Sequence, residues 1–317
     1  MTVWGVSVKR PGRRTAWAGR GMIDSSEASR AGGTACAWTG AANTVECMTR
    51  NSGSIFNSMG TLAHKIAVVT GSTSGIGRGI AERFAALGST VIVHGLSRKD
   101  GLETVRRVKA AGPDAEYVEG DLTSEQACRD LIRFAVERFG GLDILVNNAA
   151  DTGRGDLEHI PVPRWDAIMA VNLRAPFILL QESIEHMKAR GGGSVINIGS
   201  ILAYVGEPKL GAYSVSKGGL MTLTKNAASV LSRYRIRVNQ INVGWTLTEG
   251  ERRVKREDEG KGDEWVEQAI ATRPFGRLLA PLDIAHAAAY FASSDSECVT
   301  GSVLDLEQYP AGALPNS

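Results

Sequence analysis

The chain has 317 residues, of which 43% are hydrophobic and 22% charged, and its formal net charge is +2. A chain of this length can bury the core of one domain and carry an appendage besides. The small net charge argues against a nucleic-acid partner, and no apolar run approaches the length that crosses a bilayer. We therefore expect neither nucleic acid nor a membrane as a partner.

The four cysteines are scattered along the chain. They form no CxxC pair and no ligand cluster with the five histidines. We expect reduced thiols, a cytoplasmic location and no bound metal.

Residues 1–58 differ in composition from the rest of the chain. They hold seven Lys/Arg against three Asp/Glu and many Gly, Ala, Ser and Thr, with no sustained helical or strand period. They are Arg-containing and Ser-rich like a transit peptide but have no clear amphipathic helix, and they lack the apolar core of a secretory signal. We expect residues 1–58 to be a disordered or non-native extension, with Met59 as the true start and residues 59–317 as one domain.

From Lys65 onward, predicted strands and helices alternate. Ile76, Ile80, Phe84 and Leu87 have helical spacing, and Gly88 ends this helix. Short runs rich in β-branched residues predict strands between the helices. Seven such runs occur, at 65–71, 89–95, 115–121, 142–148, 193–200, 236–244 and 301–307. The alternation predicts an α/β fold: a doubly wound, Rossmann-like parallel sheet of about seven strands with helices on both faces, in a single domain.

Two details of the helices can be predicted. Thr123 with Gln126 three residues later has the pattern of a capping box, which predicts a helix that opens at Thr123. Long helices are expected at 163–189 and 210–234.

The first turn, "TGSTSGIG" at 70–77, places Gly71, Gly75 and Gly77 between a strand and a helix. Missing side chains let a backbone approach a pyrophosphate, and the helix N-terminus offers free N–H groups. A tight turn that needs positive φ would also use glycines. The spacing is G-x-x-x-G-x-G, which differs from the usual G-x-G-x-x-G dinucleotide pattern.

Tyr213 and Lys217 lie four residues apart in "GAYSVSKGGL", so a helix places both on one face. A nearby ammonium favours the phenolate and lowers a phenol pKa that otherwise lies near 10. Tyr213 could then exchange a proton with a substrate hydroxyl near neutral pH. An isolated pair of this kind is more often an ordinary exposed pair on an amphipathic helix.

Taken together, the motifs resemble the short-chain dehydrogenase/reductase family from about Leu62 to Glu307. They occur in the family's order: "TGSTSGIG", "GDL" at 120–122, "NNAA" at 147–150, "MAVNLRAPF" with Asn172, "INIGS" with Ser200, then Tyr213 and Lys217, "INVGWTLT" at 241–248 and "RPFGRLLAPLDIA" at 273–285. Two positions depart from the family pattern, Ala150 in place of glycine and Val243 in place of proline. Neither departure removes a reacting group.

The resemblance implies the roles of the site residues. Tyr213 transfers the proton, Ser200 holds the substrate oxygen, Lys217 supports the tyrosine and grips the nicotinamide ribose, and Asn172 anchors a water that continues the proton relay. Asp121 would meet the adenine, Asn147 and Asn148 would line the adenosine side, and no metal is required. The full cofactor-binding set is Gly71, Ser72, Ser74, Gly75, Ile76, Gly77, Ser97, Arg98, Asp121, Leu122, Asn147, Asn148, Ala149, Tyr213, Lys217, Val243, Thr246 and Thr248.

The choice between NAD and NADP depends on the end of the second strand. Gly95 stands where an acidic residue would bind the ribose 2′-hydroxyl and favour NAD. Ser97 and Arg98 could instead bind a 2′-phosphate, although Arg98 could equally be a solvated residue in the next helix. NADP(H) is therefore favoured, and NAD(H) remains possible.

The predicted substrate residues are Asp151, Tyr204, Glu207 and Trp245, with Thr152, Arg154 and Thr246 beside them. Several of these could be plain surface-loop residues. Residues 248–265 are expected to form a mobile, mostly solvated lid, with Trp265 able to close over the site.

The sequence thus predicts an NAD(P)-dependent oxidoreductase that moves a hydride between nicotinamide and a carbonyl or secondary alcohol. The polar pocket favours a sugar, sugar acid or polyol as the small-molecule substrate. A 3-oxoacyl-thioester (acyl carrier protein) reductase and a non-catalytic dinucleotide-binding regulator are the alternatives. The resemblance implies a homotetramer or homodimer built through the helices at 163–189 and 210–234.

Overall fold

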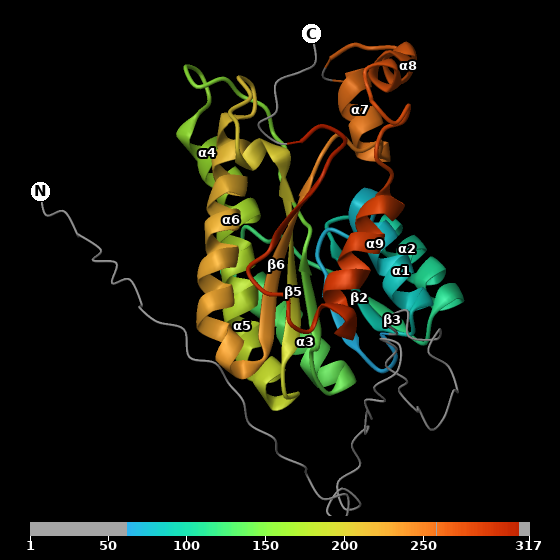
Figure 1. Ribbon diagram of the computed structural model, residues 1–317, viewed down its shortest axis with the longest axis vertical. Helices are drawn as coiled ribbons and strands as arrows, with labels where there is room; N and C mark the ends of the chain where they lie inside the picture. The colour runs from blue at the N-terminus through green and yellow to red at the C-terminus, as the bar shows by residue number, and fades with distance from the viewer. Residues whose placement is uncertain (1–61, 258, 311–317) are drawn as a thin grey trace, which may run out of the picture. The chain divides into compact units, whose positions relative to one another are not determined.

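A parallel sheet of seven strands forms the centre of the structure, a computed structural model that describes residues 62–257 and 259–310 (Figure 1). The strand order is β3-β2-β1-β4-β5-β6-β7, and every neighbouring pair is parallel. The strands are β1 Ile66–Val69, β2 Thr90–Gly95, β3 Ala115–Glu119, β4 Ile144–Asn147, β5 Gly193–Ser200, β6 Ile236–Val243 and β7 Val303–Leu306. The predicted fold class is confirmed, whereas the expectations for residues 1–58 and Met59 lie outside the described residues.

Helices cover both faces of the sheet (Figure 1). The helices α1, α2 and α9 lie on one face, and α3, α5 and α6 lie on the other. The helices α7 and α8 follow β6 and lie beyond the carboxyl ends of the strands (Figure 1). Their bounds are α1 Gly75–Ala86, α2 Arg98–Ala111, α3 Glu125–Phe139, α4 Val162–Met169, α5 Ala175–Ala189, α6 Gly211–Leu231, α7 Glu249–Glu257, α8 Glu264–Ala271 and α9 Pro281–Ala292.

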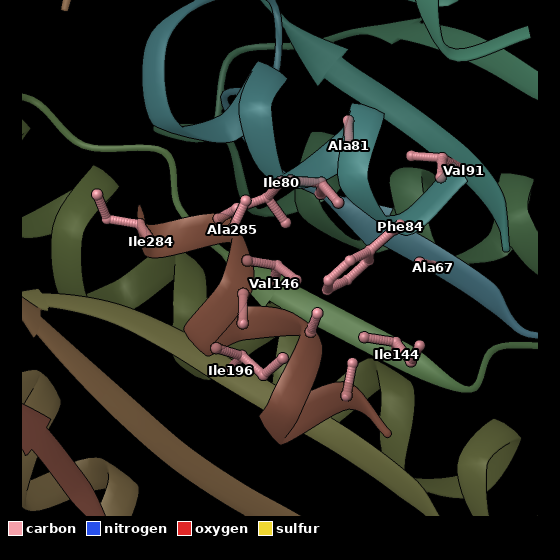
Figure 2. Packing of buried hydrophobic residues seen from close by; sticks show 14 of the residues in the cluster. Ala67, Ile80, Ala81, Phe84, Val91, Ile144, Val146, Ile196, Ile284 and Ala285 are labelled. Atoms are coloured by element: carbon pink, nitrogen blue, oxygen red, sulfur yellow. The ribbon is translucent and has the colours of Figure 1, made fainter. Parts of the chain in front are cut away.

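The sheet separates two apolar cores. In the first, Phe84 of α1 and Ile284 of α9 pack against Val146 and Ile196 of the sheet (Figure 2). In the second, α3, α5 and α6 pack against the opposite face. Truncation of a buried aromatic side chain such as Phe84 to alanine costs about 3–5 kcal/mol of unfolding free energy. Packing of this strength on both faces of the sheet holds the strands, and therefore their ends, in fixed positions.

The start of α3 corrects one prediction. Its N-cap is Ser124, whose hydroxyl accepts a hydrogen bond from the Ala127 amide at 3.3 Å. The backbone amide of Thr123 instead donates to the Asp121 carboxylate at 2.9 Å. Because this turn uses Thr123, the helix begins one residue later than the predicted capping box implies.

The stretch Val162–Ala189 corrects a second prediction. It is helical over 28 residues and contains an 18-residue window with a mean hydropathy of 1.2, which meets the length and composition of a bilayer span. Half of its most apolar window is buried inside the fold. The stretch consists of α4, a π-helical turn at Ala170–Arg174 and α5, and it packs against α3, α6 and the sheet. This burial is what a core helix of an α/β fold shows.

Candidate active site

The carboxyl ends of β4, β5 and β6 meet at one edge of the sheet, beside the start of α6. A cavity of about 500 Å³ opens at this edge. It is bordered by residues from the first βα turn, the segments after β4, β5 and β6, and α7. The lining residues are Ile76, Asn148, Ala150, Thr152, Arg154, Ile198, Gly199, Ser200, Ile201, Leu202, Glu207, Leu210, Tyr213, Lys217, Val243, Gly244, Trp245, Thr246, Thr248, Glu251, Val254 and Lys255.

Ser200, Tyr213 and Lys217 come together at the floor of this cavity. Ser200 is the last residue of β5, and its hydroxyl is hydrogen-bonded with the Tyr213 phenol. Lys217 lies one helical turn after Tyr213, with its Nζ 5.5 Å from the centre of the phenol ring. The same Nζ donates to the carbonyl oxygen of Ile198 at 2.7 Å. The structure therefore places these three side chains as the sequence spacing predicts.

The electrostatics of this group differ from the prediction. Burial raises the pKa of the Tyr213 phenol, and the hydrogen bond from Ser200 opposes this shift only in part. Burial also lowers the pKa of Lys217 to about 8. The predicted lowering of the tyrosine pKa is thus wrong for the protein alone, because desolvation of the phenolate raises that pKa by more than the hydrogen bond with Ser200 lowers it. At neutral pH Tyr213 keeps its proton and is a hydrogen-bond donor.

Asn172 lies in the π-helical turn and is fully buried. Its Oδ1 accepts from the Asp151 amide at 2.7 Å, and its Nδ2 donates to the Asp151 carbonyl at 2.9 Å and to the Ser216 hydroxyl at 3.1 Å. Both amide hydrogens are therefore used within the protein. The side chain joins the segment after β4 to helix α6, so Asn172 is a positioning residue. The water that Asn172 is expected to anchor stays a prediction.

The glycines of the first βα turn allow a close approach of backbone segments. Gly71 has φ +61°, and a Cβ there would lie 2.8 Å from the Ala149 Cα. A Cβ at Gly77 would lie 2.4 Å from the Gly71 carbonyl oxygen. Ser74, the N-cap of α1, is exposed and its side chain makes no capping hydrogen bond. The turn therefore fits a pyrophosphate, since the first N–H groups of α1 and the Ser74 hydroxyl face outward.

Two predicted cofactor residues instead stabilise the turn from within. Ser72 is buried, and its hydroxyl donates to the Val69 carbonyl at 2.7 Å and accepts from the His94 amide at 3.1 Å. Asn147 is buried in β4 and donates to the Asn197 side chain at 2.8 Å. Neither side chain lines the cavity, because both point into the sheet, so their direct contact with a cofactor is not supported.

Asn148 and Ala149 connect β4 to the glycine turn. Asn148 donates from Nδ2 to the carbonyl oxygens of Thr70 at 2.9 Å and Gly71 at 3.0 Å. The backbone amides of Asn148 and Ala149 both donate to the Thr70 hydroxyl at 3.0 Å. Of the pair, Asn148 also lines the cavity.

The end of β2 shows why no acidic residue is present there. A Cβ at Gly95 would lie 2.6 Å from the Thr73 Cγ2. Ser97 is the N-cap of α2, and its hydroxyl donates to the Asp100 carboxylate at 2.7 Å. This bond already uses the Ser97 hydroxyl, which leaves the exposed Arg98 as the group able to meet a 2′-phosphate.

Farther along this edge, Asp121 is exposed, and one carboxylate oxygen accepts from the Thr123 amide. Leu122 is buried. The Asp121 carboxylate is thus a turn-forming group whose outer face is open to solvent.

The turn after β6 is held without the family's proline. The Gly244 amide donates to the Leu306 carbonyl at 3.0 Å, and the Trp245 amide donates to the Glu307 carboxylate at 3.3 Å. A buried carboxylate at Glu307 therefore fixes this turn, although no motif in the sequence indicated it. The nearby Val243, Thr246 and Thr248 all line the cavity, and the Thr248 hydroxyl accepts from the Glu251 amide at 3.0 Å.

The predicted substrate residues divide into two groups. Glu207 and Trp245 line the cavity, as do the neighbouring Thr152, Arg154 and Thr246.

Asp151 and Tyr204 are not among the residues that line this cavity, and their roles as substrate residues stay predictions. Both oxygens of Asp151 bind the Arg164 guanidinium at 2.7 Å. Tyr204 is 45% exposed, and its hydroxyl donates to Asp305 at 3.0 Å.

The lid segment, which comprises α7, α8 and their connection (residues 249–271), contributes residues that the sequence did not indicate. Glu251, Val254 and Lys255 line the cavity. Trp265 stacks on Trp245 with ring centres 5.9 Å apart, and it is buried. The charged sequence predicted a mobile, mostly solvated lid with Trp265 able to close over the site. In the structure Trp265 and Lys255 both lie against Trp245, so one side of the segment is packed on the site.

Metal chemistry finds no support in the described part of the chain. Across residues 62–257 and 259–310, no group of three or more His, Cys, Asp or Glu side chains is arranged to hold a metal ion.

The chain is similar to known proteins over most of the described region. The family model described as enoyl-(acyl carrier protein) reductase matches residues 71–307. An uncharacterised oxidoreductase of Thermotoga maritima is 38% identical over 245 residues, which cover 74% of this chain and 90% of that protein. A D-beta-hydroxybutyrate dehydrogenase of Rhizobium meliloti is 34% identical over 251 residues, 77% of this chain and 97% of that protein.

A solved structure is similar over the same region. It is that of a candidate NAD(P)-dependent gluconate 5-dehydrogenase of Beutenbergia cavernae with bound NADP at low occupancy. It shares 31% identity with this chain, has a TM-score of 0.70, and is matched over 78% of this chain and 97% of its own.

Proposed function

Because the chain belongs to the short-chain dehydrogenase/reductase family, and so is an NAD(P)-dependent oxidoreductase, we propose that its substrate is a small hydroxylated carbonyl compound or alcohol, such as a sugar, sugar acid or polyol. The observation that carries this proposal is the lining of the cavity. The lining is largely apolar, with Ile76, Leu202 and Val254 among its residues. Around Ser200 and Tyr213 it also presents Thr152 and Glu207, which suit substrate hydroxyls. The hydroxybutyrate and gluconate dehydrogenases among the relatives are described as acting on small polar molecules, which supports the same class.

The protein's own residues provide the acid–base chemistry. A bound nicotinamide supplies the hydride chemistry, and Gly71, Ser74 and Gly77 form the turn that would hold its pyrophosphate. The Ser200 hydroxyl binds the substrate oxygen and stabilises its developing charge. Tyr213, protonated at neutral pH because its pKa is raised, donates the proton to that oxygen during reduction. Oxidation requires the Tyr213 phenolate, which receives the proton of the substrate hydroxyl.

Lys217 supports the tyrosine from one helical turn away. Its ammonium, fixed on the Ile198 carbonyl at 2.7 Å, lies close enough to the ring to stabilise the phenolate as it forms. Because burial lowers the pKa of Lys217 to about 8, this ammonium can also release its proton near neutral pH. Lys217 therefore stabilises the phenolate that forms when Tyr213 gives up its proton.

The experiment that tests this proposal is a substrate panel with the full chain. NADPH and NADH oxidation would be followed with aldoses, ketoses, oxo acids and 3-oxoacyl thioesters, and NADP⁺ and NAD⁺ reduction with sugars, sugar acids and polyols. Turnover concentrated on the hydroxylated compounds is expected. Turnover confined to 3-oxoacyl thioesters would contradict the proposal in favour of the thioester reductase, and tight dinucleotide binding without any turnover would favour a binding protein.

We also propose a preference for NADP(H), which rests on Arg98 and on the absence of an acidic residue at Gly95. Replacement Arg98→Gln removes the exposed cation nearest the expected 2′-phosphate, so the KM for NADPH should rise about tenfold while the KM for NADH stays unchanged. The matched control is Lys99→Gln, which removes the adjacent exposed cation. Equal KM changes for both dinucleotides in Arg98→Gln would contradict the proposed preference. Cytoplasmic location and assembly as a homotetramer or homodimer stay predictions.

A further inference from the structure

Four charged side chains meet at one side of the cavity. The Glu259 carboxylate, in the connection between α7 and α8, accepts two hydrogen bonds from the Lys255 ammonium, at 2.8 Å and 2.9 Å. Arg154, in the segment between β4 and α4, approaches the same carboxylate at 2.9 Å. Lys261 approaches it from the other side, also at 2.9 Å. One carboxylate therefore holds three cations.

The three cations do not have the same relation to the cavity. Arg154 and Lys255 line it, whereas Lys261 and Glu259 itself do not. The Glu259 carboxylate, which lies outside the cavity lining, thus bridges two cations that face the cavity, Arg154 and Lys255.

The surroundings of Lys255 strengthen the electrostatic interactions of its ammonium group. Its residue is only 9% exposed, and its Nζ lies 5.3 Å from the Trp245 ring centre and 6.0 Å from that of Trp265. The other nearby carboxylate, Glu251, is 3.9 Å away and accepts a hydrogen bond from the Trp245 indole at 2.9 Å. In such a partly dry setting a charge-assisted hydrogen bond is about twice as strong as a neutral one.

The Arg154–Glu259 ion pair also joins two separate parts of the site. Arg154 belongs to the body of the domain, and Glu259 belongs to the lid segment. The hydrogen bonds of Lys255 and Lys261 hold the pKa of Glu259 down at about 2, so this carboxylate is ionised throughout the physiological range. Whatever anion sits between Arg154 and Lys255 therefore links the lid to the body.

We propose that the substrate is an acid whose carboxylate takes the place of Glu259 on Arg154 and Lys255. This inference rests on the proposed function and narrows its substrate class to hydroxy or oxo acids, sugar acids among them. A carboxylate fits because the planar, two-oxygen group of Glu259 already satisfies the donors of both cations. A neutral polyol offers nothing to displace Glu259, so the protein's own ion pair would persist and the cations would add no affinity for it.

Binding of matched pairs tests the proposal directly. Each pair shares a carbon skeleton and differs in carboxylate against CH₂OH: D-gluconate and D-glucitol, D-glycerate and glycerol, 3-hydroxybutyrate and butane-1,3-diol. Dissociation constants would be measured by calorimetry on full-length Tyr213→Phe with saturating NADP⁺, in which turnover is blocked. We expect the acid of at least one pair to bind about tenfold or more tightly than its alcohol.

Four variants in the same background assign that preference to the cluster. Arg154→Gln and Lys255→Met should each reduce the acid-to-alcohol ratio about tenfold, since each removes a charged donor. Glu259→Gln should raise acid affinity several-fold, because it removes the internal competitor. Lys261→Gln is the matched control, since it removes a cation that contacts Glu259 but does not line the cavity, and it should leave the ratio unchanged.

The outcomes separate this inference from the proposed function. If no acid binds about tenfold more tightly than its alcohol, or if Arg154→Gln and Lys255→Met weaken acids and alcohols equally, the inference is overturned and the cluster only stabilises the lid. Weaker acid binding in Glu259→Gln would contradict the exchange itself. The dissociation constants are measured without turnover. If the substrate panel showed no turnover with hydroxylated compounds, the proposed function would fail, but the acid-to-alcohol binding ratio could still be measured and would test this inference separately.

Discussion

Two buried lysines, Lys217 and Lys255, border the same cavity, but their charges have different surroundings. Lys217 is 2% exposed and donates to one backbone carbonyl, and no carboxylate of the described residues pairs with it. Lys255 is 9% exposed and is surrounded by two glutamates and two tryptophan rings. Burial lowers the pKa of Lys217 to about 8, because nothing compensates the lost hydration.

This difference in surroundings suits the Lys217 region and the Lys255 region to different functions. The Lys217 region is built from a strand end and a long helix, so its positions are fixed by apolar packing and its charge can be gained or lost. The Lys255 region is held by ion pairs, of which Lys255–Glu259 is local and Arg154–Glu259 joins segments far apart in sequence, so it can exchange one anion for another. The first region suits proton transfer, and the second suits substrate selection.

The largest effect is expected where the chemistry takes place. Replacement Ser200→Ala removes the hydroxyl that holds the substrate oxygen, so kcat should fall about a hundredfold or more while dinucleotide binding is retained. Steady-state kinetics and a dinucleotide titration check both parts. The matched control is Ser214→Ala on α6, whose buried hydroxyl has no hydrogen-bond partner among the described residues, and which should keep full activity. A similar loss in both variants would mean that only packing was disturbed.

The next effect concerns the stability cost of Lys217. Below pH 8 the folded and unfolded states both carry its proton, whereas between pH 8 and the ordinary value of 10.5 only the unfolded state keeps it. This group therefore makes the protein more stable as pH rises through that window. Relative to Lys217→Met, the wild type should gain on the order of 2 kcal/mol of unfolding free energy between pH 8 and about pH 10.

Urea denaturation of both proteins at the two pH values measures this gain. The difference between them cancels the other groups that titrate there, such as Cys128, whose pKa burial raises to about 11. Parallel stability curves for the two proteins would show that Lys217 is not destabilised by its burial.

The smallest effect is expected in the lid segment and depends on salt. Exposed or half-exposed ion pairs such as those of Lys261 and Arg154 contribute about 1 kcal/mol or less each and are screened by salt. Raising NaCl from about 0.05 M to about 0.5 M should speed amide exchange in α7 and α8 a few-fold and leave β5 and α6 unchanged. Equal salt sensitivity in the two regions would remove the distinction between them.

Sequence patterns predicted the first region well and the second poorly, for physical reasons. The strands, the glycine turn and the Tyr213–Lys217 spacing are local features with fixed periods, so the residues themselves indicate the geometry. The contacts of Asp151, Tyr204 and Glu259 are made with residues far along the chain, such as Arg164, Asp305 and Arg154. No local period reports such pairings. Lys255 was missed for another reason: its glutamate partners lie four residues away, but the charge run gives no sign that this lysine is buried against Trp245 and Trp265.

Burial also limited what the sequence could say about charge. The short spacing of Tyr213 and Lys217 indicated an attraction, but the sequence does not show how dry the surroundings are. Desolvation, which depends on the packed layers around α6, reversed the expected shift of the tyrosine pKa. The identity of the reacting groups was therefore predictable, whereas their protonation was not.

The central claim is that Tyr213 transfers the proton in an active oxidoreductase, and a pair of tyrosine variants tests it most directly. Turnover and dinucleotide binding would be measured for Tyr213→Phe and Tyr204→Phe with the substrate that the panel identifies. We predict that Tyr213→Phe loses at least about a hundredfold in kcat with its dinucleotide affinity intact, and that Tyr204→Phe, whose ring lies outside the cavity, stays near wild type. Turnover by Tyr213→Phe within a few-fold of wild type would contradict the account.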